Sequence, residues 1–466
     1  MTGLRTSSEL DLLVQLRRDR PEPLHQQLEA EIREAIRGGR LEAGAVVPSS
    51  RALANDLGLS RGVVIEAYEQ LAAEGYLDTR PGGTTRVAEA AARRQPSAVE
   101  PDAAPSYRVD FRSGRPDVSQ FPRSLWLRSL RRVLNEAPSN RFTYLGGRGA
   151  PELRNALASY LDRVRGTCAH PDNLVITTGY AQAFGLTVRV LQAMGARRLA
   201  MEDPSQEDSR AIARAAGLDV IGIPVDDLGL RIDELERSAA DAALVTPAHQ
   251  MPTGAVLPPE RRATLVAWAK ARNGLIIEDD YDAEYRYDRT PIGAIQGLAP
   301  DRVIYAGSSS KTLAPGLRLG WLLAPHELIP ALADAKEAAD RGSPILEQLA
   351  FADFLARGEF DRHLRRMRPI YRRRRDALLF ALRRELPAFR PVGASAGLHV
   401  LAWLPDGMEE SAVSEAAARR GVGVYGLEKH WISDGPSGLL FGYAALSEPV
   451  IAEGVELLAA AIDDLA

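Results

Sequence analysis

The sequence predicts an α/β protein in which a small helical N-terminal domain precedes a larger domain with a mostly parallel sheet. Helices with clear capping residues are expected between residues 24 and 74, whereas from residue 107 onward short apolar strands alternate with helical stretches. Residues 88–106 are rich in Ala, Pro and Glu and show no periodicity, which is typical of a linker. The predicted domains of the 466-residue chain are therefore 1–88 and 107–466, joined by a linker at 89–106.

The N-terminal domain is predicted to contain three helices and a hairpin. The first helix follows from apolar residues that recur every four positions, namely Leu24, Leu28, Ile32 and Ile36. A second helix spans residues 51–57, and a third, capped by Ser60, spans residues 61–74. Apolar positions on both sides of Pro81-Gly82-Gly83 predict a hairpin. The order helix, helix, short turn, helix, hairpin is that of a winged helix-turn-helix.

The helix starts and the wing carry residues suited to DNA. In a helix-turn-helix the third helix enters the major groove, and helix starts and the wing contact phosphates. The candidate DNA-binding residues are Ser49, Ser50, Arg51, Ser60, Arg61 and Arg86. Residues 1–88 hold 11 Arg and 13 Asp/Glu, so a domain that binds protein instead stays open on pattern alone.

Composition restricts the remaining possibilities. The single cysteine, Cys168, excludes an intrachain disulfide and a cysteine-built zinc site, and no metal site is expected. No segment approaches the ~18 apolar residues of a membrane span, and acidic Glu9 and Asp11 argue against a signal peptide. We therefore expect a cytoplasmic protein that does not bind membranes. The net charge of −4 gives no general sign of nucleic-acid binding, so any such surface must be local.

In the larger domain four strands are predicted, at Leu174–Thr177 and at residues 242–246, 275–278 and 303–306. From about Pro344 the pattern is helix-rich and then more antiparallel, which indicates a smaller α+β lobe.

The strongest chemical signal is a lysine in a chain that has few. Lysine and arginine total 58, of which four are lysines, leaving 54 arginines. Lys311 stands in Ser308-Ser-Ser-Lys-Thr-Leu-Ala-Pro-Gly-Leu-Arg-Leu-Gly320, directly after a predicted strand. Its amine can form a Schiff base with an aldehyde cofactor, while Ser308, Ser310 and Arg318 can neutralise a phosphate.

Two other strand ends point to the same chemistry. Residues 275–278 run into Asp279 and Tyr281, a carboxylate that can pair with a pyridine nitrogen and a phenol that can reach the ring oxygen. Leu174–Thr177 runs into the turn Gly179-Tyr180-Ala181 and then a helix, whose free N–H groups suit a phosphate.

Both halves resemble known families. The stretch from Pro48 to Leu77 closely resembles the GntR family of winged helix-turn-helix regulators, which implies that double-stranded DNA is a partner. Residues 110–466 resemble the fold-type I, aspartate-aminotransferase-like proteins that use pyridoxal 5'-phosphate (PLP). This resemblance implies the fold, the cofactor and the roles of Lys311 as the catalytic Schiff-base lysine, Asp279 as partner of the pyridine nitrogen and Tyr281 as partner of the ring oxygen. It also implies a phosphate cup of Ser308, Ser310, Arg318, Gly179, Tyr180 and Ala181.

The resemblance further implies a homodimer. The sequence also differs from the aminotransferase pattern at several positions. Tyr144 matches the tyrosine that reaches the partner subunit's phosphate. Met251, with His249-Gln250 upstream, stands where aminotransferases have an asparagine, and Gln206 stands where an aromatic ring stacks on the pyridine. No arginine for a substrate carboxylate can be placed; Lys429 or His430 can substitute for it, or both are structural.

The complete chain resembles the MocR/GabR subfamily of GntR-type transcription regulators. That resemblance implies a PLP-dependent DNA-binding regulator, a head-to-tail dimer, whose aminotransferase-like domain senses an amine, an amino acid or PLP through a Schiff base at Lys311. Two alternatives remain: an active aminotransferase with an accessory DNA-binding domain, and a regulator whose large domain is a cofactor-free scaffold.

Overall fold

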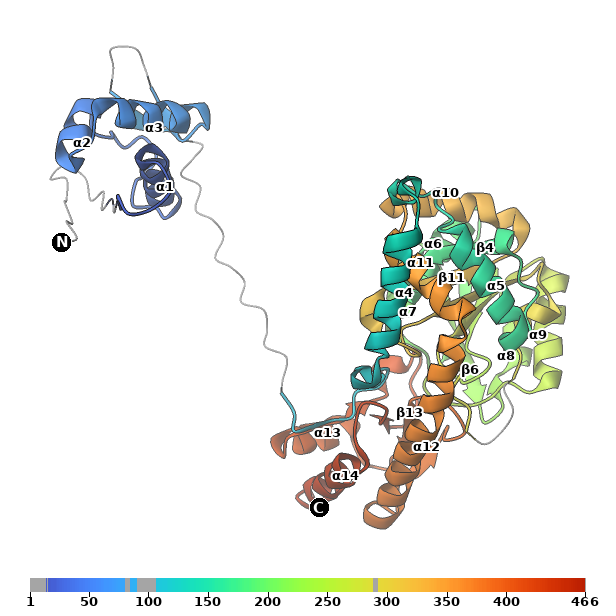
Figure 1. The fold of residues 1–466 in the computed structure, drawn as a ribbon. Helices are drawn as coiled ribbons and strands as arrows, with labels where there is room; N and C mark the ends of the chain where they lie inside the picture. Colours follow the sequence, from blue (N-terminus) through green and yellow to red (C-terminus); the bar gives the residue numbers. More distant parts are fainter. Residues whose placement is uncertain (1–13, 15, 80–83, 90–105, 288–291, 466) are drawn as a thin grey trace. The chain divides into compact units, whose positions relative to one another are not determined.

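A computed structural model describes residues 14, 16–79, 84–89, 106–287 and 292–465. The chain divides into two compact units, Met1–Ala104 and Pro105–Ala466 (Figure 1). Of the predicted linker at 89–106, only Glu89 and Ser106 belong to the described residues, and the predicted turn Pro81-Gly82-Gly83 lies outside them.

The small unit has the predicted element order. Its elements are α1 (Leu24–Arg37), α2 (Ser50–Leu57), α3 (Arg61–Ala73), β1 (Leu77–Asp78) and β2 (Arg86–Val87). The two strands pair antiparallel, with Leu77 opposite Val87. Leu28 and Ile32 of α1 are buried together with Val64 and Leu71 of α3, so the apolar faces of the two helices build one core.

The large unit is built on an eight-stranded sheet with the order β4-β11-β10-β9-β8-β5-β6-β7. The strands are β4 (Leu174–Thr177), β5 (Arg198–Asp203), β6 (Asp219–Asp226), β7 (Gly229–Leu230), β8 (Ala242–Val245), β9 (Leu275–Asp280), β10 (Val303–Ser308) and β11 (Gly320–Leu323). Strands β10, β9, β8, β5 and β6 are mutually parallel, whereas β11 and β7 run antiparallel to their neighbours. The mostly parallel sheet predicted from the sequence is confirmed.

Helices cover both faces of this sheet, which is why its strands are almost continuously apolar. Successive residues alternate between the two cores: Ile276 faces one layer and Ile277 the other. The first layer contains α5 (Pro151–Arg165), α8 (Ile232–Arg237), α9 (Pro259–Arg272) and α11 (Ile345–Ala356), with α4 (Arg123–Glu136) packed on α11. The second contains α6 (Tyr180–Ala193), α7 (Glu207–Ala215) and α10 (Ile329–Asp340) (Figure 1).

The C-terminal part is a smaller α+β lobe, as predicted. The 27-residue helix α12 (Glu359–Glu385) leads into it. An antiparallel sheet of β12 (Arg390–Val392), β13 (His399–Trp403), β16 (Gly438–Gly442) and β15 (Tyr425–Gly426) is accompanied by α13 (Glu410–Arg419) and α14 (Glu448–Asp463). The short strand β3 (Val109–Asp110) pairs parallel with β14 (Val422–Gly423), so the first described residues of the large unit join this lobe.

Two strands are longer than predicted, and both carry site residues. The apolar runs predicted strands at 275–278 and 303–306, but β9 extends to Asp280 and β10 to Ser308. The reason is backbone pairing: Ala306 lies opposite Asp279 and Gly307 opposite Asp280, so the ladder continues through polar residues. Asp279 is therefore held by the sheet and not by a loop.

A buried ion pair fastens α5 to β9. Arg165 Nε donates to Asp280 Oδ2 at 2.7 Å, and Tyr305 Oη donates to the same oxygen at 2.6 Å. The side chains of Arg165 and Asp280 are 1% and 2% exposed. Among the described helices, none is both long and apolar enough to cross a membrane.

We predict that Arg165→Met destabilises the large unit by about 3–5 kcal/mol, because Asp280 stays buried without its cation. Arg163→Met is the control, since Arg163 pairs with Asp361 at the surface and loses at most about 1 kcal/mol. Urea denaturation followed by tryptophan fluorescence measures the change in the large unit alone, because all five tryptophans lie there. Equal losses for the two variants would contradict this account.

Candidate functional site

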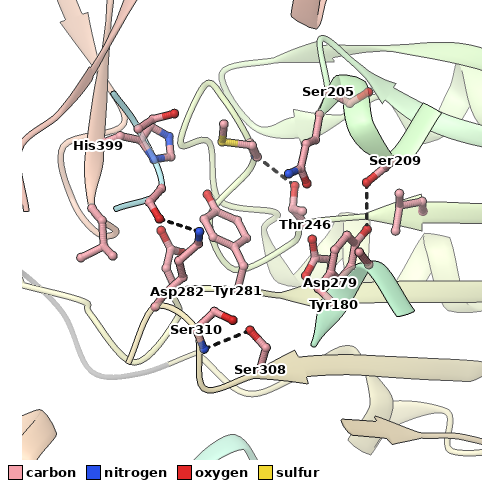
Figure 2. A pocket seen from close by; sticks show the side chains of 18 of the residues that line it. Tyr180, Ser205, Ser209, Thr246, Asp279, Tyr281, Asp282, Ser308, Ser310 and His399 are labelled. Carbon is pink, nitrogen blue, oxygen red and sulfur yellow. Dashed lines mark hydrogen bonds between the residues drawn. The ribbon is translucent and has the colours of Figure 1, made fainter. Parts of the chain in front are cut away.

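The predicted site residues come together at the carboxyl ends of the parallel strands, where open α/β sheets bind ligands. A cavity of about 340 Å³ lies there. Eight of the residues predicted from the sequence line it: Tyr180, Ala181, Asp279, Tyr281, Ser308, Ser310, Lys311 and Arg318. Figure 2 shows Tyr180, Asp279, Tyr281, Ser308 and Ser310 among the residues of the cavity wall. Three separate strand ends therefore contribute to one site.

Lys311 lies in the turn after β10, with its amine inside the cavity. Its Nζ donates a 2.6 Å hydrogen bond to the carbonyl oxygen of Gly114. Burial lowers the pKa of Lys311, although the charges of Asp282 and Asp279 oppose this effect. A larger fraction of the amine is therefore neutral than in an exposed lysine, and the neutral amine is the nucleophilic form.

One end of the cavity is suited to an anion. Ser308 and Ser310 line it, and α6 begins there with Gly179 as its N-cap residue. Arg318 adopts a left-handed backbone conformation (φ 50°), which is uncommon for a residue other than glycine. A Cβ atom on Gly179 would lie 3.4 Å from the guanidinium of Arg318, so Gly179 adjoins this end although it does not line the cavity. Hydroxyls, a guanidinium and a helix N-terminus are the groups that bind phosphate.

The cavity is also lined by the carboxylate of Asp279, which has no cationic side chain paired with it among the described residues. Asp279 lies beside Tyr180 (Figure 2), and the Tyr180 hydroxyl is 3.1 Å from Ser209 Oγ. Burial, together with the charges of Asp280 and Asp282, raises the pKa of Asp279 well above its ordinary value. Among the described residues, Asp279 forms no ion pair, so it can take up a cationic N–H from a ligand.

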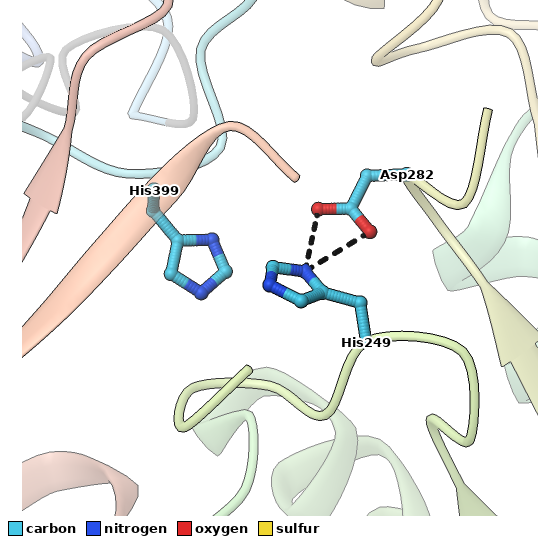
Figure 3. Close-up of side chains that lie close together, drawn as sticks. All are labelled: His249, Asp282 and His399. Atoms are coloured by element: carbon cyan, nitrogen blue, oxygen red, sulfur yellow. Dashed lines mark hydrogen bonds and ion pairs between the residues drawn. The ribbon is translucent and has the colours of Figure 1, made fainter. Parts of the chain in front are cut away.

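Tyr281 belongs to a buried group that sequence reasoning did not identify. Its hydroxyl is 3.0 Å from His249 Nδ1, and the same nitrogen is 3.0 Å from Asp282 Oδ2. His399 of β13 packs against His249, with ring centroids 5.1 Å apart (Figure 3). Asp282 follows Tyr281 directly, which is a weak sequence signal, but nothing local links His399 to the others.

The two departures from the aminotransferase pattern face the cavity. Met251 and Gln206 both line it, so no aromatic ring stands at the position of Gln206. Glu202 lies nearby and accepts hydrogen bonds from Thr246 and Gln250. Burial raises the pKa of Glu202 to about 7.

Besides Gly179, three further residues that the sequence singled out do not line the cavity. Tyr144 is 91% exposed. The side chain of Lys429 is exposed as well, and the carbonyl oxygens of Lys429 and His430 accept hydrogen bonds from Arg210. His430 Nδ1 lies 3.1 Å from the carbonyl oxygen of Ser205, which favours a structural role for this histidine.

In the small unit, five of the six predicted DNA-binding residues lie at two adjacent helix starts. Ser49 caps α2 by accepting from Ala52 N, and Ser60 caps α3 by accepting from Val63 N. Arg61 Nε lies 3.4 Å from Ser50 Oγ, which brings the N-termini of α2 and α3 together.

The two remaining arginines of this set are exposed, and one of them lies on the wing. Arg51 is exposed on α2. Arg86, on β2, donates to the carbonyl oxygen of Gly44. Exposed arginines and helix N-termini are groups that can contact phosphates.

Comparison with known proteins assigns both units. Residues 24–87 match the family "Bacterial regulatory proteins, gntR family", and residues 109–430 match "Aminotransferase class I and II". The pyridoxine biosynthesis transcriptional regulator PdxR of Corynebacterium glutamicum is 33% identical over 95% of this chain and 96% of its own length. The probable rhizopine catabolism regulatory protein MocR of Rhizobium meliloti is 32% identical over 96% of this chain and 95% of its own.

Among solved structures, the large unit is similar to LysN, an α-aminoadipate aminotransferase of Thermus thermophilus complexed with N-(5'-phosphopyridoxyl)-L-leucine. The TM-score is 0.70 at 28% identity, over 77% of this chain and 92% of that one. A gntR-family domain and an aminotransferase domain thus occur in one chain. The two regulators named above match this chain over nearly their full length. The chain belongs to the MocR/GabR type of helix-turn-helix transcriptional regulators, in which an aminotransferase class I/II domain follows a GntR-type DNA-binding domain.

Proposed function

We propose that this regulator binds PLP in the cavity of its large unit and that an amine, an amino acid or further PLP, acting at Lys311, changes its affinity for DNA. The observation that carries the proposal is the single cavity that gathers Lys311, Asp279, Tyr281 and Arg318 in the same chain as a gntR-family domain. A DNA-binding regulator acts where the chromosome is, so we propose the cytoplasm as its location.

The cavity fits the chemistry of PLP. Its volume of about 340 Å³ falls in the range of small-molecule sites. Ser205 Oγ lines the cavity and is buried without a hydrogen-bond partner among the described residues, as expected where a ligand supplies one. Gly114 has a φ of +75°, which favours glycine, and a Cβ atom there would lie 3.0 Å from Lys311 Nζ.

Each group of the cavity has a role toward such a ligand. Ser308, Ser310, Arg318 and the start of α6 would hold the phosphate, and Asp279 would accept the pyridine N–H. Lys311 would bond to the aldehyde carbon and Tyr281 would donate to the ring oxygen. When bound, PLP supplies an aldehyde that reacts with amines and an electron-withdrawing ring.

Regulation then requires a difference in binding between two states. A ligand shifts DNA affinity only as far as it binds one arrangement of the protein better than the other. We propose that these arrangements are those of a head-to-tail homodimer. The 91% exposed Tyr144 supports this, since a side chain outside its own cavity is free to reach the partner's phosphate.

An active aminotransferase is the second candidate, because Lys311, Asp279 and Tyr281 all line the cavity of an aminotransferase fold. Steady formation of a keto acid from an amino acid and an acceptor, lost in Lys311→Ala, would establish turnover. A single conversion that stops at one equivalent of protein would favour sensing alone.

We predict that purified wild-type protein mixed with PLP develops the visible absorbance band of PLP bound to an amine and that Lys311→Ala does not. Lys270→Ala is the matched control, because Lys270 is an exposed lysine on α9. Borohydride reduction followed by peptide mass spectrometry should then find the pyridoxyl group on Lys311. An equal band in all three proteins would reject the proposed attachment.

We also predict that Arg61→Ala weakens DNA binding by roughly ten-fold and lowers the slope of log affinity against log salt by about one, because one phosphate or base contact is lost. The measurement is fluorescence anisotropy on a duplex that wild-type protein selects from randomised DNA. Arg37→Ala is the control, since Arg37 contacts Tyr76 beyond the far end of α3. Unchanged affinity and slope in Arg61→Ala would show that the N-terminus of α3 does not contact DNA.

A further inference from the structure

His249, Tyr281 and Asp282 form a buried hydrogen-bonded chain that ends at the cavity. His249 and Asp282 have side chains that are each 1% exposed, whereas Tyr281 lines the cavity. The three residues come from the loop after β8 and from the segment after β9, so the fold brings them together. None of the roles assigned above requires His249 or Asp282.

Both ring nitrogens of His249 face oxygen acceptors. Nε2 lies 3.2 Å from the carbonyl oxygen of Gly393, which can only accept. Nδ1 lies 3.0 Å from Asp282 Oδ2 and 3.3 Å from Oδ1. A neutral imidazole has one N–H and would leave one of these acceptors unpaired, whereas the imidazolium donates to both.

Other groups around His249 agree with a charged ring. Burial is the largest effect on the pKa of His249 and lowers it, but the charge and hydrogen bond of Asp282 and the hydrogen bond to Gly393 act the other way, and the pKa is raised. The other ionisable groups that act on this ring are Tyr281, Arg286 and His399. Burial, followed by the charge of His249, lowers the pKa of His399 well below its ordinary value, so His399 is neutral. One positive and one negative charge are thus paired inside the protein.

The surrounding backbone is built closely around this pair. Gly397 has a φ of +81°, and a Cβ atom there would lie 2.2 Å from His249 Cε1 and 2.5 Å from Asp282 Oδ2. A Cβ atom on Gly254 would lie 2.8 Å from His249 Nε2. A side chain at either position would collide with the pair, so the glycines allow the backbone to pack closely against it.

We propose that the His249–Asp282 pair orients Tyr281 as a hydrogen-bond donor to the cavity. A protonated Nδ1 cannot accept, so its single proton is shared between Asp282 and the Tyr281 oxygen, and the phenol must direct its own proton elsewhere. Among the described residues, His249 is the sole hydrogen-bond partner of this hydroxyl, and the cavity is the space left to its proton. His249 and Asp282 are positioning residues, acting through Tyr281.

The same three residues can form a second hydrogen-bond arrangement, in which His249 is neutral and accepts from Tyr281. Without the charge of Asp282, a buried His249 is neutral and keeps its proton on Nε2 for Gly393. Nδ1 then accepts from Tyr281, and the phenol proton turns away from the cavity. Asp282→Asn should therefore have the same effect as losing the Tyr281 hydroxyl.

The inference rests on the proposed binding of PLP, since a donor at Tyr281 is useful toward an anionic ring oxygen. A hydrogen-bond donor favours the anionic form of its acceptor. Loss of the donor should therefore raise the pH at which the visible band of PLP-loaded protein titrates. We expect a rise of about one pH unit relative to wild type, a ten-fold change in proton affinity, in each of His249→Gln, Asp282→Asn and Tyr281→Phe. His326→Gln, at an exposed histidine outside the cavity, is the control and should leave the titration unchanged.

A double variant separates positioning from general damage. His249→Gln added to Tyr281→Phe should cause no further shift, because the effect passes through the phenol. Additive shifts would overturn the proposal, and so would an unshifted band in His249→Gln. A wild-type protein that forms no band would instead overturn the proposed function.

A second measurement does not depend on PLP. Nitrogen-15 NMR of full-length, histidine-labelled protein should assign to His249, by comparison with His249→Gln, a ring protonated on both nitrogens at neutral pH. In Asp282→Asn this ring should be neutral. A neutral His249 in wild type would overturn the proposal. So would stoichiometric metal in the purified protein, because His249, Asp282 and His399 offer ligand atoms within 4.8 Å of one another and a metal at Nδ1 would displace the proton.

Discussion

The large unit depends on how it accommodates a run of buried carboxylates at the end of β9. Glu278, Asp279 and Asp280 are consecutive strand residues, and Asp282 follows the turn. Buried carboxylates must be paired or become protonated. Alternation along the strand directs Glu278 and Asp280 toward the face covered by α5 and α9, and Asp279 toward the cavity.

Three of these four carboxylates have partners inside the protein. Glu278 accepts from the backbone N–H groups of Ile295 and Gln296. Asp280 is paired with Arg165, and Asp282 with His249. Among the described residues, Asp279 has neither an ion pair nor backbone N–H donors like those of Glu278, and burial raises its pKa well above its ordinary value. Because Glu278, Asp280 and Asp282 already have partners inside the protein, Asp279 is the carboxylate whose charge a bound ligand can control.

Much of the site could be predicted from the sequence because each of its parts is local. A strand followed by Lys311, a strand followed by Asp279 and Tyr281, and a strand followed by Gly179 are short patterns. Their neighbours in the sheet are set by the parallel topology. The order of the N-terminal elements was also predictable, since Ser49 and Ser60 are capping residues read directly from the chain.

The rest depends on contacts between distant segments. Arg165 and Asp280 are 115 residues apart, and His249 and Gly393 are 144 apart, so no spacing rule connects them. The extension of β9 and β10 through polar residues follows from pairing with each other, which apolar patterns do not detect. The packing of His399 against His249 requires the small lobe to close over the end of the large sheet.

The DNA-binding unit illustrates how local charge differs from net charge. Residues 1–88 are slightly acidic overall, yet the starts of α2 and α3 adjoin through Ser50 and Arg61. Two sets of free backbone N–H groups and exposed arginines therefore share one surface. Attraction of this kind acts over about a Debye length, roughly 8 Å at physiological salt, so acidic residues elsewhere weaken it little.

The hydrogen bond between Lys311 and Gly114 connects the proposed Schiff-base lysine with the first strand of the large unit. Gly114 lies five residues after Val109, where β3 pairs with β14, so the stretch 109–114 connects the lysine with the beginning of the large unit. A lysine nitrogen that formed a Schiff base would keep at most one of an ammonium's three protons, so fewer donors would be left for Gly114. Residues 109–114, six residues of backbone, thus link the amine of the proposed Schiff-base lysine to the pairing of β3 with β14.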